Sequence, residues 1–361
     1  MWEYCFTRHA AFERNMINTS NWSVQILSLL WSYLFTWPDM LIRKVATVAT
    51  VLSLADSALT RSYVIAGGGS AGLLLAVQLS ADPQVTVTVL EAGYSGFGNA
   101  SIYDPRQRLS IQGTEFDWKF QSVPQPQLNN TIIPVQRGKV LGGSSAMNAL
   151  IMHRSGKYEY DLWESLGNKG WNWNSFFEAW KDLETFHPPI TNYTSLITYR
   201  KDHHGFSGPI SSTLQTNVSS LFTDYIIPTM NSLGHRIADV DGEGGNATGA
   251  GFRPLAVLPL NFTRSYSGSA YFHVEGRPNL RVYTRAQATR ITWGPKKNGL
   301  AVASGFEYVN LDTGDKHTVK GTDIIVSGGA ISTPPLLEYS GIGDPSILTK
   351  FGIQPVVNLS A

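Results

Sequence analysis

Residues 63–80 read "YVIAGGGSAGLLLAVQLS", which is a short β-branched run, a glycine loop and an apolar helical run in immediate succession. Within it Gly67, Gly69 and Gly72 give the spacing G-x-G-x-x-G. Between a strand and a helix, these glycines permit a tight turn, let the backbone approach a pyrophosphate, and let helix and strand pack closely. The free N–H groups and the positive dipole end of such a helix favour phosphate. The stretch therefore predicts an α/β, doubly wound fold with a dinucleotide site that includes Ser70 and Ala71.

The strand that follows supports this prediction. Residues 85–93 read "VTVTVLEAG", and Glu91 lies nineteen residues after Gly72, close to the spacing of about 20 that is typical of a Rossmann-like dinucleotide site. A carboxylate at this place accepts hydrogen bonds from ribose hydroxyls and disfavours a 2′-phosphate, and hence NADP. The first loop alone does not distinguish NAD from FAD.

A second segment of small residues lies some seventy residues later. Residues 137–148 read "RGKVLGGSSAMN", in which Gly142, Gly143 and Ser144 let the backbone come close to a flat or charged ligand. Asn148 can donate and accept hydrogen bonds at the edge of a heterocycle. Residues 322–343, "TDIIVSGGAISTPPLLEYSGIG", add a strand that ends in two glycines, which predicts a further parallel strand at the same crevice. Three glycine turns at one crevice suit an extended ligand such as FAD better than NAD.

Three sequence blocks together resemble the glucose–methanol–choline (GMC) oxidoreductase family, and most of all its fungal, secreted, aryl-alcohol-oxidase-like branch. The blocks are "YVIAGGGSAG…VLEAG", "GKVLGGSSAMN…YDLWESLGNKGWNW" and "GAISTPPLLEYSGIG", and the resemblance runs from about Ser62 to Gly343. It implies an FAD enzyme that passes a hydride from a small alcohol to flavin N5, with oxygen or a quinone as acceptor. It also implies that the first loop holds the diphosphate, that the second, with Val140 and Asn148, lies along the flavin ring, and that Ala288 lies near the adenine.

The sequence departs from the family pattern at several places. Met152 stands where an aromatic residue is usual and Ser155 where a glycine is usual. Some members attach FAD through a histidine in the second loop, and because Met147 occupies the corresponding place, non-covalent FAD is expected. The family's catalytic histidine block lies beyond "SGIG" and has no match here, so we expect a truncated chain with no catalytic residue. Two alternatives stay open: a non-catalytic remnant, and an NAD-dependent dehydrogenase.

Composition and isolated residues narrow the possible partners. The chain of 361 residues has 28 Lys+Arg against 27 Asp+Glu, which gives no sign of a nucleic-acid partner. Cys5 is the single cysteine, so a disulfide framework and a cysteine-based zinc site are excluded. His203 and His204 lack a third ligand at suitable spacing, and we expect a surface loop there rather than a metal site. His153 is close to the second loop and could touch the cofactor.

The N-terminal residues and the asparagines indicate export. Residues 1–61 are interpreted as a leader with a signal peptide that starts at Met40, whose sequence "MLIRKVATVATVLSLADSALT" has a basic, an apolar and a small-residue region. The apolar run 22–37 is sixteen residues long, short of the about 20 that a spanning helix needs, so a membrane anchor is not expected. Sequons support a secreted glycoprotein; they lie at Asn99, Asn129, Asn192, Asn217, Asn246, Asn261 and Asn358.

The same motifs suggest a domain plan. Residues 62–185 form the first part of the FAD domain, 186–260 belong to an incomplete α+β substrate domain with an antiparallel sheet and a helix, and 261–361 return to the FAD domain. In "WNWNSFFEAWKDLE", residues 171–184, the aromatic face predicts a core helix with Ser175 and Glu178 as a capping box. Residues 239–252, "DVDGEGGNATGAGF", are expected to be a flexible acidic loop near the substrate entrance.

Overall fold

The computed structural model describes residues 61–189, 199–214, 219–235, 242–246 and 248–360. The predicted leader, the signal peptide and the Met40 start fall on residues 1–60, outside these ranges, as do the sequons at Asn192 and Asn217. Residues from Arg61 onward belong to one unit of the chain. Among the described helices, none combines the length and the apolar character that crossing a membrane requires.

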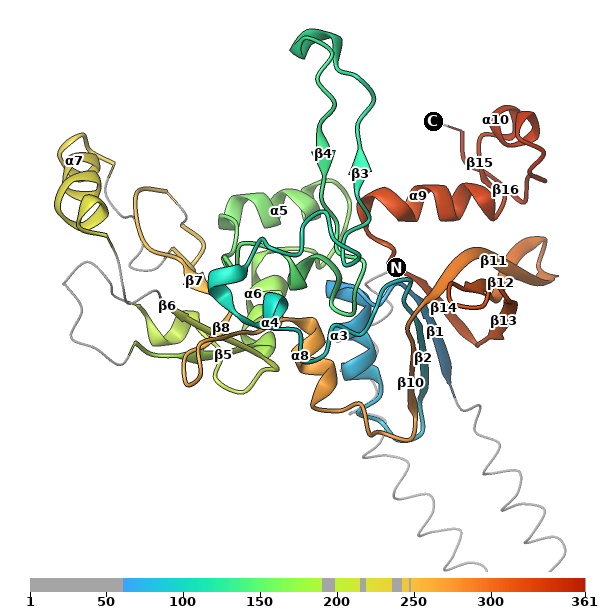
Figure 1. Ribbon diagram of the computed structural model, residues 1–361, viewed down its shortest axis with the longest axis horizontal. Coiled ribbons are helices and arrows are strands. Elements are labelled where there is room, and N and C mark those ends of the chain that lie inside the picture. Colours follow the sequence, from blue (N-terminus) through green and yellow to red (C-terminus); the bar gives the residue numbers. More distant parts are fainter. Residues whose placement is uncertain (1–60, 190–198, 215–218, 236–241, 247, 361) are drawn as a thin grey trace, which may run out of the picture. The chain divides into compact units, whose positions relative to one another are not determined.

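A four-stranded parallel sheet carries the first glycine loop. Its order is β10 (Leu280–Tyr283), β2 (Thr86–Leu90), β1 (Ser62–Ala66) and β14 (Asp323–Val326). In Figure 1, β14 from the red end of the chain lies beside β1 from the blue end, with Ala66 in register with Val326. Helix α3 (Ser70–Leu79) connects β1 to β2. The predicted strand–loop–helix–strand unit and the later parallel strand are therefore both confirmed.

The two faces of this sheet are covered by different layers, because successive side chains on a strand point to opposite faces. Ile65 and Val87 pack with Ala76 of α3, and Val64 packs with Phe306 of a second sheet. That second sheet is antiparallel and comprises β11 (Ala286–Lys297), β12 (Leu300–Asn310) and β13 (Lys316–Lys320). Helix α9 (Gly329–Tyr339) contributes Leu336 to the same core. The α/β fold class is confirmed, and the glycine loop lies at the carboxyl edge of a sheet with apolar packing on both faces.

The segment between β2 and β10 contains short elements around a mixed sheet. Strands β5 (Glu184–His187) and β6 (Ile210–Leu214) are parallel, and β7 (Pro254–Leu255) is antiparallel to β6. The expectation of an antiparallel sheet is wrong for the β5–β6 pair, because the 22 residues 188–209 between them are long enough for the crossover that parallel strands need. The other elements of this segment are α4 (Ala100–Tyr103), β3 (Phe120–Gln121), β4 (Pro134–Val135), α5 (Lys157–Ser165), α6 (Trp173–Leu183), α7 (Ile227–Ser232), β8 (Val257–Leu258), β9 (Thr263–Arg264) and α8 (Ser267–Phe272). Elements α10 (Pro345–Lys350), β15 (Ile342–Gly343) and β16 (Val357–Asn358) follow α9.

Helix α6 begins one turn earlier than the predicted capping box. The side-chain oxygen of Asn172 accepts a hydrogen bond from the Ser175 backbone N–H at 3.2 Å, so Asn172 is the N-cap and the Ser175–Glu178 box is wrong. Asparagine is among the strongest N-cap residues, and it precedes Trp173, the first helical residue. Trp173 is buried as predicted, whereas the other aromatic residues of this helix are half-buried.

Candidate cofactor site

The first glycine loop has no room for side chains at two positions. A Cβ at Gly67, whose φ is +105°, would lie 2.4 Å from the Ser327 carbonyl oxygen. A Cβ at Gly72 would lie 2.1 Å from the Gly67 carbonyl oxygen. The loop, α3 and the end of β14 therefore approach so closely that only glycine fits at both positions.

Backbone donors at the start of α3 lack acceptors among the described residues. Gly69 is the N-cap and makes no side-chain cap, and Ser70 and Ala71 are exposed. Within the described part of the chain, the N–H groups of these three residues have no hydrogen-bond acceptor. A helix leaves its first N–H groups without intrahelical partners, and together with the helix dipole they form a site for an anion.

Glu91 lies at the end of β2, beside the same loop. One carboxylate oxygen accepts from Gly68 N–H at 2.9 Å and the other from Gly93 N–H at 2.8 Å. Burial raises the pKa of Glu91 to about 7, although both hydrogen bonds and the Lys139 charge act in the opposite direction. Each oxygen keeps a further lone pair, so the carboxylate can still accept hydrogen bonds from hydroxyl groups.

The second glycine segment packs directly against the first. Gly142 N–H donates to the Gly68 carbonyl at 2.8 Å, and a Cβ at Gly143 would lie 2.8 Å from the Gly69 Cα. Residues Gly143–Ala146 form a short 3₁₀ turn, in which Ser144 is exposed. Val140 is fully buried below this turn, in a cluster with Met147. The structure thus brings two segments some seventy residues apart into one continuous surface.

Asn148 is the last residue of this second segment, and two hydrogen bonds hold its side-chain oxygen. Its Oδ1 accepts from the Leu150 backbone N–H at 3.0 Å and from Arg264 Nη1 at 2.7 Å. Arg264 is 2% exposed and also donates to the carbonyl oxygens of Ser145 and Asn148, both at 3.1 Å. No sequence motif indicated Arg264, because a single sequence does not distinguish a buried arginine from a surface arginine.

Ala288 lies on β11, two residues after Ala286 at the start of that strand. It is half-buried, opposite Tyr308, and packs against the cluster that contains Leu90. The same strand begins where Ala286 N–H donates to the Glu91 carbonyl oxygen at 2.8 Å. Ala288 therefore lies on the strand that begins beside Glu91. Its contact with an adenine stays a prediction.

The two adjacent histidines are not on the surface. His203 and His204 are 6% and 4% exposed, and the His204 ring stacks on Phe186 with centroids 3.8 Å apart. His204 Nδ1 lies 3.0 Å from Glu184 Oε2. The expected surface loop is thus wrong, because a carboxylate and an aromatic ring let the histidine be buried. By contrast His153 is exposed.

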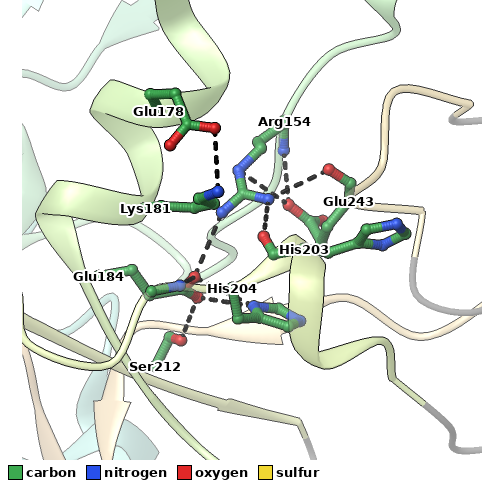
Figure 2. Close-up of polar contacts among 9 residues, drawn as sticks. Arg154, Glu178, Lys181, Glu184, His203, His204, Ser212 and Glu243 are labelled. Carbon is green, nitrogen blue, oxygen red and sulfur yellow. Dashed lines mark hydrogen bonds and ion pairs between the residues drawn. The ribbon is translucent and has the colours of Figure 1, made fainter. Parts of the chain in front are cut away.

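Arg154 links these residues to the acidic loop (Figure 2). Its guanidinium donates to Glu184 Oε2 at 3.2 Å, and to the carbonyl oxygens of His203 and Glu243. Its backbone N–H donates to Glu243 Oε2 at 3.1 Å. Glu243 is 2% exposed, so the described part of the predicted acidic loop is anchored by a buried carboxylate rather than free in solvent.

The pKa values of the two carboxylates in the Arg154 cluster, which we define as Arg154, Glu184, His204 and Glu243, are shifted in opposite directions. Burial raises the pKa of Glu243 to about 7 against the nearby arginine charges. Burial also acts to raise the pKa of Glu184, but hydrogen bonds from His204 and Ser212 and the Arg154 charge outweigh it and hold that pKa below its usual range. Across the described ranges no group of three His, Cys, Asp or Glu side chains is placed to hold a metal ion.

Comparison with known proteins identifies the family. The family model for GMC oxidoreductases matches residues 61–356. The GMC oxidoreductase family protein Mala s 12 of Malassezia sympodialis is 37% identical over 306 residues, which are 82% of this chain and 49% of that protein. The chain belongs to the GMC oxidoreductase family, as its motifs predict.

Solved structures show the same fold. An FAD-dependent oxidoreductase from Chaetomium thermophilum matches with a TM-score of 0.75 and 31% identity, over 83% of this chain and 50% of that one. A fungal aryl-alcohol oxidase matches with a TM-score of 0.70 and 27% identity, over 83% of this chain and 51% of that one. The chain spans about half the length of the relatives that it matches.

Proposed function

We propose that this chain binds FAD non-covalently and that the enzyme oxidises the CH–OH group of a small alcohol, with oxygen or a quinone as electron acceptor. When bound, FAD supplies a hydride acceptor at flavin N5. An NAD-dependent dehydrogenase would not explain why the second glycine segment packs against the first. The name of the fungal aryl-alcohol oxidase and the family membership support the alcohol as substrate class.

The observation that carries the proposal is the contact between the two glycine segments. Their backbones touch at Gly69 and Gly143, so a ligand held at the start of α3 extends directly onto the second segment. The free N–H groups of Ser70 and Ala71 suit a diphosphate, and Glu91 suits ribose hydroxyls. NAD would use only the first glycine loop and Glu91, whereas the flavin ring of FAD would also contact Asn148.

The chain's own residues would bind and orient the cofactor. Glycine at positions 67, 69 and 72 lets the backbone approach the diphosphate, and the exposed edge of Asn148 can donate to the flavin ring. The buried Met147 offers no nucleophile for a covalent bond to FAD. We assign no catalytic base within the described residues; His153, close to the second segment in the sequence, is exposed.

A test uses Gly72→Val in the full chain. The new side chain would collide with Gly67 and Ser327, so FAD binding should be lost, whereas Gly276→Val, at a position with open space and no positive φ, should keep it. Fluorescence titration with FAD and with NAD measures both. Tight binding of NAD but not FAD by the unaltered chain would overturn the proposal in favour of a nicotinamide enzyme.

We also propose export as a glycoprotein. Four sequon asparagines in the described ranges are exposed: Asn129, Asn246, Asn261 and Asn358. Asn99 is half-buried and its Oδ1 caps α4 by accepting from Ser101 N–H at 2.9 Å. Expression in a eukaryotic host, with a mass measurement before and after glycosidase treatment, tests this. An intracellular product of unmodified mass would contradict it.

A further inference from the structure

We propose that Arg264 is a positioning residue of the flavin site, which turns the amide NH₂ of Asn148 toward the cofactor and places a positive charge behind the second glycine segment. This inference rests on the proposed function. It concerns a residue that no sequence motif indicated and that contacts the segment from its buried side.

The first argument is the number of backbone groups that Arg264 holds. Its guanidinium donates to the carbonyl oxygens of Ile102 at 2.8 Å, Arg108 at 3.2 Å, and Ser145 and Asn148, both at 3.1 Å. These carbonyls come from two segments more than thirty residues apart in the sequence. One planar guanidinium, with five donors in fixed directions, therefore sets the course of the chain around Asn148.

The second argument concerns the orientation of the Asn148 amide. The two groups that approach one end of it, Arg264 Nη1 at 2.7 Å and Leu150 N–H at 3.0 Å, are both donors. Only the amide oxygen can accept from them, so the NH₂ group must lie at the other end. Asn148 is exposed, and its NH₂ has no acceptor among the described residues. The exposed edge is thus a hydrogen-bond donor.

The third argument is the charge of Arg264. No carboxylate in the described ranges lies within ion-pair distance of its guanidinium, and its acceptors are neutral oxygens. Burial lowers the pKa of Arg264 to about 10, which still leaves the group protonated at neutral pH. A charge in a buried place is only weakly screened by salt. The site therefore has a fixed positive potential behind the exposed face of Asn148.

This potential bears on the reduced cofactor. A reduced flavin carries negative charge on the ring part opposite N5, and a nearby positive charge and a hydrogen-bond donor both favour that form. The same electronic change can be measured without substrate by sulfite addition to the oxidised flavin. Sulfite would add to the bound flavin and leave the ring negatively charged, so its affinity would report the positive charge of Arg264 and the donor of Asn148.

The test compares sulfite dissociation constants of FAD-loaded full-length chains. For Arg264→Gln we expect about tenfold weaker sulfite binding and a lower reduction potential, by about 30 mV for a two-electron couple if the same factor applies. Arg264→Lys keeps the charge and should change sulfite binding by less than about threefold. The matched control is Arg277→Gln, because Arg277 also donates to backbone, at Val77, but at the far end of α3.

A second variant makes the test independent of the folding of Arg264→Gln. Asn148→Asp keeps the shape of an exposed side chain, removes the NH₂ donor, and places a carboxylate 2.7 Å from the guanidinium. It should weaken sulfite binding about tenfold without lowering the thermal unfolding midpoint, because the new carboxylate compensates the buried charge of Arg264. Sulfite binding within twofold of the unaltered chain in Asn148→Asp and in any folded Arg264→Gln would overturn the inference while leaving FAD binding intact. A chain that binds no FAD would overturn the proposed function itself.

Discussion

Arg154 and Arg264 are both 2% exposed, yet their surroundings differ in kind. Arg154 lies between two buried carboxylates, Glu184 and Glu243, whereas the partners of Arg264 are carbonyl oxygens and one amide. Burial without charge compensation is costly, so a buried arginine without a carboxylate is unusual. The positive charge of Arg154 is therefore compensated by neighbouring carboxylates, whereas the positive charge of Arg264 can still interact with a ligand.

The two regions also each contain a buried carboxylate of raised pKa. Glu243 has a pKa of about 7 in the Arg154 cluster, and Glu91 has a pKa of about 7 beside the glycine loops. Glu243 lies 3.9 Å from Arg154, measured between Oε2 and Nε, while the hydrogen-bond donors to Glu91 are backbone N–H groups. In the Arg154 cluster the buried charges thus lie next to charges of opposite sign, whereas the region of the glycine loops retains hydrogen-bonding capacity on both Glu91 and Asn148.

The largest effect is expected when Arg154 is removed. Arg154→Met leaves Glu184 without its arginine and leaves Glu243 with Arg253, at 3.9 Å, which should lower the free energy of unfolding by about 3–5 kcal/mol. Urea denaturation followed by circular dichroism measures this. Adding Glu184→Gln to Arg154→Met should recover part of the loss, and a single-variant loss below about 1 kcal/mol would contradict the description of a compensated cluster.

Removing Arg264 should cost less stability. Arg264→Met strands carbonyl groups but no buried charge, so the expected loss is about 1–3 kcal/mol in the same denaturation experiment. FAD affinity should fall as well, because the second glycine segment loses its support. If Arg264→Met were more destabilising than Arg154→Met, the contrast between the two arginines would be broken.

FAD affinity should depend on pH through Glu91. The ionised carboxylate accepts ribose hydroxyls better than the acid, so binding favours loss of the proton, whose pKa is about 7 in the free chain. Affinity should therefore rise between pH 6 and pH 8, by at most about tenfold per pH unit. Titrations at several pH values should give a flat profile for Glu91→Gln. A profile of equal slope in that variant would exclude Glu91 as the cause.

A smaller pH effect is expected on stability through Glu243. Because its pKa in the folded chain is raised to about 7 from an ordinary 4.5, its contribution to stability is full below about pH 4.5 and is lost as the pH rises through 7. Glu91 acts in the same direction, so the informative quantity is the difference between the unaltered chain and Glu243→Gln. That difference, from denaturation at pH 5 and pH 8, should change with pH in the stated sense.

The smallest effect is expected at an exposed ion pair next to the Arg154 cluster. Lys181 Nζ lies 2.9 Å from Glu178 Oε1, and the Glu178 side chain is 65% exposed. Glu178→Gln removes the pair while Lys181 stays over the Phe177 ring, so the loss should stay below about 0.5 kcal/mol. A loss comparable to that of Arg154→Met would mean that burial does not decide the strength of these pairs.

The parts that sequence predicted well depend on short-range backbone requirements. The strand, glycine loop, helix and acid of residues 63–91 follow one another in the chain, and the structure has them at the predicted places. The parallel strand β14 was also predictable, since its apolar run ends in glycines as β1 does. Local pattern therefore predicted the sheet edge that carries the first glycine loop.

The parts that sequence missed depend on long-range contacts. Arg264 contacts Asn148, 116 residues away, and His204, which precedes β6, contacts Glu184 of β5, 20 residues away. Neither pair has a spacing that a helix or strand period would reveal, and a charged residue in one sequence is expected at the surface. Such long-range contacts explain why the sequence predicted His203 and His204 at the surface and did not indicate Arg264.

The most direct test of the account is the flavin content of the purified full-length chain. After denaturation with heat or acid, the soluble fraction should contain about one FAD per folded chain, because the two glycine segments form one site and Met147 offers no covalent link. A natively folded chain that carries no FAD and binds none on titration would contradict the central claim. FAD that stays with the precipitated protein would contradict the non-covalent mode.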